Sequence, residues 1–235
     1  SINSATSSVA YSNWRYNETK GNPNAPELSV SDYSIPHRIV ASLSYGKEYA
    51  KRFKSTVSLV YTGQSGAPYN ITYYGDLNGD GSNGNDLVFI PTDEQIDAMQ
   101  FKAKGNLDAD QQKADLKAFL GSAKYLKDHR GEYYERNSDR MSFEHHFDFR
   151  FLQDFKFRVA KETHTLQFSV DIMNVGNLLN RKWGLESYMS NNSYSPISYS
   201  GGGEFQYTQG DKYDPFKEIS NISSRWRCQL GLRYI

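Results

Sequence analysis

The feature that most constrains this chain is a regular alternation of side-chain character over residues 143–157. From Phe143 onward every second residue is Phe, apart from His145 and Gln153, and the residues between are mostly charged. Period-two alternation is typical of a strand with one apolar and one polar face. At about 3.3 Å per residue the run would reach roughly 50 Å, whereas strands of soluble domains usually end near 17–20 Å. The run therefore predicts a tilted membrane-crossing strand, with its apolar side toward lipid and its charged side toward a watery lumen.

Further segments alternate in the same way, although the first, with Tyr11, Trp14 and Tyr16, does so imperfectly. We predict further strands at residues 8–16, 37–45, 55–62, 165–172 and 225–234. The connections between successive strands are long, short, long, short and long, and the long ones cover about residues 17–35, 64–141 and 174–223. This asymmetry is typical of outer-membrane barrels, which have short periplasmic turns and long outer loops.

The predicted fold class is all-β, an antiparallel transmembrane β-barrel segment with long extracellular loops that carry short helices. Six strands are fewer than the eight of the smallest such barrels, and an open edge in lipid would leave backbone groups unsatisfied. We therefore expect the chain to be part of a larger barrel.

The long connection at residues 64–141 far exceeds the median of about 4–6 residues. Thr92 followed by Gln95 fits a capping box that opens a helix at 93–101, and Asp108 or Asp110 could cap a second helix. The second helix would carry Leu116, Phe119, Leu120 and Ala123 at helical spacing. In the connection at 174–223 we expect hairpin segments near Tyr188 and Phe205.

Composition excludes several classes. The 27 basic and 27 acidic side chains give no net charge, so nothing draws the chain to nucleic acid. The mean hydropathy of −0.73 and the lack of an apolar run of about 18 residues argue against a membrane-spanning helix. They do not argue against barrel strands, because only every second residue of such a strand is apolar. Aromatic residues make up 14%, which suits interfacial girdles but also a Tyr-rich carbohydrate-binding module. Cys228 is the single cysteine, which excludes an internal disulfide framework and a cysteine-based metal site.

Several segments resemble one family. Residues 32–40 (DYSIPHRIV), 77–81 (LNGDG) leading to 85–91 (NDLVFIP), and 129–137 through 153–155 resemble TonB-dependent outer-membrane receptors, and most of all their Oar-like and SusC-like branch. Residues 174–180 (NVGNLLN) and 229–234 (QLGLRY) are similar to the last two strands of that branch.

The resemblance implies a 22-stranded barrel with an N-terminal plug, energised through TonB, in the outer membrane of a Gram-negative bacterium. Residues 1–235 would supply about the last six strands, without the plug, the TonB box or the earlier strands. The implied function is uptake of a large or scarce nutrient such as a glycan or peptide, and not enzymatic catalysis. The implied partners are the rest of the same receptor, TonB through the plug, and membrane lipid. The SusC-like branch often has a surface lipoprotein lid as well, a partner that this sequence alone does not establish.

A calcium loop is the strongest candidate site. Asp76, Asn78 and Asp80 followed by Gly81 reproduce the first half of an EF-hand loop, where oxygen ligands at positions one, three and five surround the ion. The twelfth position is Leu87, and Asp86 stands one place earlier. We predict that Asp76, Asn78, Asp80 and Asp86 bind calcium; the alternative is a solvated, Asn- and Gly-rich turn.

Two other patterns are weak. His145 and His146 adjoin Glu144, but neighbours on a strand point to opposite faces and cannot share one ion. Residues 63–67 (GQSGA) narrowly miss a nucleophile elbow, so a hydrolase that uses Ser65 has little support. The main rival function is a soluble or surface-attached all-β ligand-binding module that contains calcium, which would not explain the strand length.

Overall fold

The structure, a computed structural model, describes residues 8–189, 192–209, 217–218 and 222–235. The chain is mostly β-sheet with few helices, in agreement with the all-β prediction. It forms two compact units. The first contains the described residues of Ser1–Ser34, Ala67–Arg140 and Met189–Lys217, and the second those of Ile35–Gly66, Met141–Tyr188 and Glu218–Ile235.

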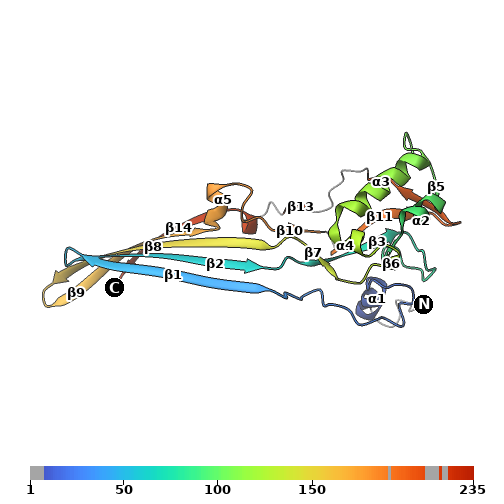
Figure 1. The fold of residues 1–235 in the computed structure, drawn as a ribbon. Helices are drawn as coiled ribbons and strands as arrows, with labels where there is room; N and C mark the ends of the chain where they lie inside the picture. Colours follow the sequence, from blue (N-terminus) through green and yellow to red (C-terminus); the bar gives the residue numbers. More distant parts are fainter. Residues whose placement is uncertain (1–7, 190–191, 210–216, 219–221) are drawn as a thin grey trace. The chain divides into compact units, whose positions relative to one another are not determined.

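The second unit is built on one antiparallel sheet, here called the long sheet. Its strands lie side by side in the order β1-β2-β8-β9-β14 (Figure 1). They are β1 (Arg38–Tyr49), β2 (Phe53–Gln64), β8 (Glu144–Val159), β9 (Glu162–Met173) and β14 (Arg227–Tyr234). All five coincide with predicted strands. With 16 residues, β8 is about 50 Å long, as the alternation predicts.

The hairpins of the long sheet are tighter than predicted. Strand β1 continues to Tyr49 and β2 begins at Phe53, so the link between the predicted strands 37–45 and 55–62 shrinks to three residues, of which Ala50 and Lys51 have φ of 49° and 56°. Between β8 and β9 only residues 160–161 remain, and Ala160 has φ of 57°. Positive φ values match the twist that two-residue hairpin turns require, so the strands can pair up to the turn.

The prediction of a first strand at residues 8–16 is wrong. These residues form helix α1 (Ser8–Arg15), in which Arg15 Nη1 donates to Tyr11 Oη at 3.0 Å, a contact between residues one helical turn apart. Tyr11 and Trp14 are three apart, which fits a helical face better than a strand face. The long sheet thus has five strands rather than six, and within the described residues β1 and β14 each pair on one side only, so the sheet is not closed.

The first unit contains a sheet that the sequence did not predict, here called the mixed sheet. Its order is β5-β12-β11-β3-β7, and β3 runs parallel to β11 although they lie far apart in sequence. The strands are β3 (Pro68–Tyr74), β5 (Gln100–Phe101), β7 (Asp139–Arg140), β11 (Ser193–Tyr199) and β12 (Glu204–Tyr207). Strands β11 and β12 form the hairpin expected near Phe205.

Helices of the first unit agree with the capping signals. Thr92 and Gln95 form the predicted capping box of α2 (Asp93–Ala98), which ends before the predicted Phe101 because that residue belongs to β5. Asp108 caps α3 (Ala109–Ser122), followed by α4 (Lys124–Asp128). Leu116, Phe119 and Leu120 of α3 are buried, and the Phe119 ring lies 5.8 Å from that of Tyr207 on β12. Strands β4 (Phe89–Ile90) and β6 (Glu132–Tyr133) form a separate pair.

Residues 174–180, which resemble part of the last two strands of TonB-dependent receptors, do not form a strand in this structure. Asn174 adopts a left-handed conformation with φ of 53°, which ends β9, and α5 (Val175–Leu179) follows. The remaining elements are short: β10 (Ser187–Tyr188), which pairs with β13 (Lys217–Glu218), and the 3-10 turn η2 (Ile222–Ser224).

Candidate functional site

Residues 76–86 form a loop between β3 and β4, here called the aspartate loop. Asp76 anchors its start, because its Oδ1 accepts from the amides of Gly79 at 2.7 Å and Asp80 at 3.0 Å. Its Oδ2 accepts from the amide of Gly81 at 2.9 Å. Gly79 and Gly81 have φ of 75° and 87°, a region where glycine is favoured. Both Asp76 oxygens are thus engaged by the backbone.

Asp80 lies at the centre of the loop's side-chain contacts. Its Oδ2 accepts from Asn78 Nδ2 at 3.1 Å and from Asn85 Nδ2 at 3.0 Å, and its Oδ1 accepts from the amide of Ser82 at 2.7 Å. Asn78 in turn accepts from the Asp80 amide at 2.9 Å. The loop therefore brings Asn78, Asp80 and Asn85 together.

Asp86 closes the loop from a buried position, with 4% of its surface exposed. Its Oδ2 accepts from the amides of Leu77 at 2.7 Å and Asn78 at 3.3 Å. Burial raises the pKa of the Asp86 carboxyl, and the charges of Asp80 and Asp76 add to the rise, against the lowering effect of the two amide hydrogen bonds. These carboxylates are therefore close enough to repel one another.

The structure brings the four predicted ligands, Asp76, Asn78, Asp80 and Asp86, into one loop. Across the described ranges no group of three or more His, Cys, Asp or Glu side chains is arranged to hold a metal ion. A site here would therefore need amide, hydroxyl or main-chain oxygens besides carboxylates. Sequence reasoning missed Asn85, although its place beside Asp86 in an Asn-rich loop was a usable signal.

The two weak sequence patterns, at His145–His146 and around Ser65, form neither a metal site nor a nucleophile elbow. On the long sheet, His145 Nδ1 pairs with Tyr61 Oη at 2.9 Å, while His146 Nε2 lies 3.9 Å from Glu186 Oε1. The two rings thus have separate partners. Ser65 lies between β2 and β3 and donates its amide to His37 O at 2.9 Å, so no strand-turn-helix elbow forms around it.

One face of the long sheet, here called the apolar face, carries continuous hydrophobic rows. The pairing registers align Leu43, Leu59, Phe149, Ile172 and Cys228 across all five strands. A second row, two residues along each strand, contains Tyr45, Val57, Phe151, Val170 and Leu230. These rows are not covered: Leu43 at the β1 end is 73% exposed and Leu230 at the β14 end 66%.

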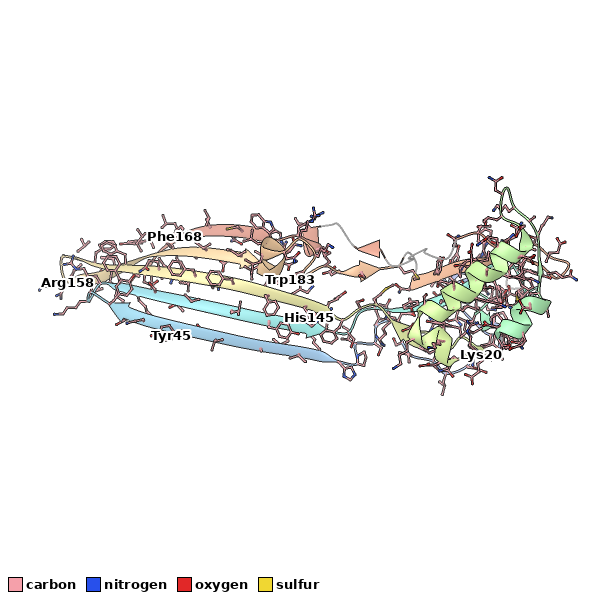
Figure 2. All side chains as sticks on the ribbon, turned by 45° about the horizontal axis from the view of Figure 1, so that its top comes forward. Lys20, Tyr45, His145, Arg158, Phe168 and Trp183 are labelled. Atoms are coloured by element: carbon pink, nitrogen blue, oxygen red, sulfur yellow. The ribbon has the colours of Figure 1, made fainter. Side chains whose placement is uncertain are left out.

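Aromatic rings border these rows at both ends. Toward the hairpin turns a series of rings with centroids 5.2 to 5.9 Å apart forms the Phe155 belt, which contains Tyr49, Phe53, Phe155, Phe157, His164 and Tyr234. Toward the other end lies the Phe147 belt, which contains Tyr61, Phe143, His145 and Phe147. From Phe147 to Phe155 the strand rises about 26 Å. Figure 2 labels His145 and Arg158, which mark opposite ends of β8.

The opposite face, here called the polar face, is cross-linked by charged and amide pairs. Arg150 on β8 is paired with Asp171 on β9, and Lys156 on β8 lies 2.7 Å from Glu48 on β1. Gln64 Nε2 donates to Glu144 at 3.0 Å. Val40, Val60, Leu152 and Met173 are the apolar exceptions. The sheet thus separates exposed apolar from paired polar side chains, as the alternation predicts.

The first unit also contains a cavity of about 810 Å³. Its wall is formed by residues 17–22 and 25–30, with Leu87, Glu135, Arg136 and Ser138. Arg136 holds this wall: its Nη2 donates to both oxygens of Asp32, at 3.0 and 3.1 Å, and its Nε to Glu18 at 3.1 Å. Lys20 pairs with Glu27 at 2.9 Å, and that hydrogen bond raises the pKa of the Lys20 ammonium.

Within the described part of the chain no helix has the length and apolarity of a membrane span. Comparisons of the sequence with models of protein families and with curated proteins, and of the structure with solved structures, found no match.

Proposed function

We propose that this chain forms part of the wall of an outer-membrane β-barrel, within a TonB-dependent transporter of the Oar-like or SusC-like branch. The observation that carries the proposal is the apolar face, where two exposed hydrophobic rows lie between two aromatic belts. Transmembrane barrels have such a face, an apolar band about 25 Å tall between aromatic girdles. For β8 tilted by about 35–45°, the rise of about 26 Å from Phe147 to Phe155 corresponds to a height of about 18–22 Å, slightly less than this band.

The polar face supports the same assignment. In a barrel this face lines a hydrated lumen, where ion pairs such as Arg150–Asp171 are stable and solvated. A soluble protein rarely exposes a continuous apolar patch larger than a few hundred Å², whereas here the rows cross five strands. Strands β1 and β14 would pair with further strands of the same receptor, because lipid cannot satisfy their free edges.

The connections support a transport role. The inserts at residues 65–143 and 174–226 both start and end at the Gln64 and Glu144 end of the long sheet, while tight turns join the strands at the other end. In outer-membrane barrels the long connections are extracellular. We assign to the whole receptor the uptake of a large or scarce nutrient such as a glycan or peptide, with TonB acting through a plug and with no catalytic step.

Cys228 provides a direct test, because it is the sole cysteine of the chain and lies in a hydrophobic row of the apolar face. In the whole receptor reconstituted into liposomes, with any other cysteine replaced by serine, an environment-sensitive dye on Cys228 should show blue-shifted emission and quenching by doxyl lipids but not by aqueous iodide. The matched variant Cys228→Ser/Gln229→Cys moves the dye to the polar face, where iodide should quench it.

The rival, a soluble ligand-binding module, makes the opposite prediction. Such a protein would stay in solution as a monomer without detergent, and a dye at either position would be quenched by iodide and unaffected by doxyl lipids. That result would overturn the membrane assignment.

A further inference from the structure

Three buried oxygen atoms near the aspartate loop have no hydrogen-bond partner. They are Asp86 Oδ1, Asn85 Oδ1 and Thr19 Oγ1, and the three residues are only 4%, 1% and 6% exposed. A buried polar atom without a partner destabilises the folded chain. Three such atoms on residues that contact one another indicate that the loop is built for a group that these oxygens bind.

The three residues belong to two segments that the backbone holds together. The Thr19 amide donates to Asn85 O at 2.9 Å, and the Leu87 amide donates to Thr19 O at 2.9 Å. Thr19 and Asp86 form a parallel β-bridge, and paired residues of a bridge present their side chains to the same side. The hydroxyl of Thr19 and the carboxylate of Asp86 therefore face a common space.

Asn85 precedes Asp86 in the chain and contacts Asp80, the second carboxylate of the site. Its amide nitrogen donates to Asp80 Oδ2 at 3.0 Å, so a flip of the amide group is enough to turn its unpartnered oxygen toward the same carboxylate. A cation between the two groups would favour that orientation. Oxygen ligands alone, without His or Cys, select a hard cation. Calcium accepts an irregular set of six to eight carboxylate, amide and carbonyl oxygens, whereas magnesium requires a near-octahedral one.

We propose that a calcium ion binds in the aspartate loop through Asp80, Asn85 and Asp86, with the hydroxyl of Thr19 as a ligand from a second segment. This ligand set differs from the one that the sequence predicts. Asp76 orders the loop through its three backbone contacts, and Asn78 through its bonds with the Asp80 amide and Gly21 O. Neither holds the ion in this proposal, and Asn85 and Thr19 take their places. The proposal does not depend on a location in the membrane.

The ion has a consequence beyond the loop, because residues 15–21 are docked on the loop by further bonds. Ser82 Oγ donates to Arg15 O at 2.8 Å, and Asn78 Nδ2 donates to Gly21 O at 2.6 Å. Residues 17–22 continue into the wall of the 810 Å³ cavity. Calcium would therefore fix this wall, and its removal would release the chain around Lys20.

The test uses the purified protein, freed of metal with EGTA and then titrated with CaCl2 by calorimetry, with MgCl2 in a parallel titration. We expect one calcium site, much weaker magnesium binding, and calcium-dependent protection of the Lys20–Gly21 bond from trypsin. Asp86→Asn retains an acceptor for the loop amides but removes the charge, and it should weaken calcium binding at least tenfold and abolish the protection. Thr19→Val keeps the side-chain shape and should weaken binding several-fold.

Asp110→Asn is the matched control, since it removes one carboxylate charge from an exposed position of α3 in the same unit. It should bind calcium like the unaltered protein. Thermal unfolding in EGTA shows whether each variant folds, and Asp80→Asn replaces Asp86→Asn if the latter does not. The proposal is overturned if the unaltered protein binds no calcium at millimolar concentration, or if folded Asp86→Asn or Asp80→Asn protein binds it with unchanged affinity.

Discussion

Tyr49 and Gln153 meet on the apolar face of the long sheet, where Tyr49 Oη donates to Gln153 Oε1 at 3.0 Å. Ser55 Oγ donates to the same oxygen at 2.6 Å, and Gln153 Nε2 donates to the main-chain oxygens of Lys54 and Asp154. The side-chain amide of Gln153, which interrupts a line of phenylalanines, thus has hydrogen-bond partners for both its oxygen and its nitrogen. It lies next to the Phe155 belt, which the proposed barrel would place at the level of the lipid headgroups.

We predict that Gln153→Leu lowers the free energy of unfolding by about 0.5–1.5 kcal/mol, because Tyr49 and Ser55 lose their shared acceptor and retain only the hydrogen bond between their two hydroxyls, at 3.0 Å. Urea unfolding in detergent, followed by tryptophan fluorescence, measures the change. The triple variant Tyr49→Phe/Ser55→Ala/Gln153→Leu removes all the polar partners and should recover most of the loss. A single variant as stable as the unaltered protein would show that the hydrogen bonds to Gln153 contribute nothing.

Gly63 provides the space in which the Tyr61 ring lies. A Cβ atom at Gly63 would be 2.2 Å from Tyr61 Oη and 2.9 Å from the Phe143 ring. Gly63→Ala should therefore displace Tyr61, break its bond to His145 and cost about 1–3 kcal/mol of unfolding free energy. Gly46→Ala is the control, because its nearest neighbour, Thr56 Oγ1, would be 3.3 Å away and the cost should be small. Equal stability of the two variants would contradict this role of Gly63.

Arg136 stabilises the cavity wall through Glu18 and Asp32. Arg136→Ala leaves both carboxylates without this partner and should cost about 2 kcal/mol, a value reduced for the partial exposure of Asp32. Arg136→Lys should recover little, because lysine cannot reproduce the planar fork. Hydrogen exchange of residues 29–32 reports the change locally. Lys20→Ala breaks an exposed pair and should cost less than about 1 kcal/mol; a similar cost for both would refute the special role of Arg136.

Tyr73 makes the first unit sensitive to alkali. Burial raises the pKa of its phenol to about 12, against the smaller lowering effect of the hydrogen bond to Phe89 O. Since the unfolded phenol titrates near pH 10, the stabilisation is complete below that pH and is lost as pH rises to about 12, a total of about 3 kcal/mol. Burial also raises the pKa of Tyr69 and Tyr134. Urea unfolding between pH 9 and pH 12 should show a shallower decline for Tyr73→Phe, and an unchanged slope would disprove the effect.

Sequence patterns predicted the long sheet well because its information is local. Each strand carries its own period-two alternation, so 143–157 could be assigned without its partners. The mixed sheet could not be predicted, because β3 and β11 pair in parallel across more than a hundred residues and each is short. Helix α1 was missed because the two-residue spacing of Trp14 and Tyr16 was weighted over the helical spacing of Tyr11 and Trp14. At the aspartate loop the acidic spacing was visible, but the bridge between Thr19 and Asp86 joins segments that no local motif connects.

The register of the long sheet places Gln64 opposite Glu144, so the segment between them leaves and returns at a single residue pair. A segment that starts and ends at one residue pair can have almost any length, because strand pairing fixes the alignment and a longer loop adds little closure entropy. Residues 65–143 can therefore be lengthened, shortened or exchanged in evolution while the strands of the long sheet keep their alignment. Variation in this segment costs the long sheet little stability.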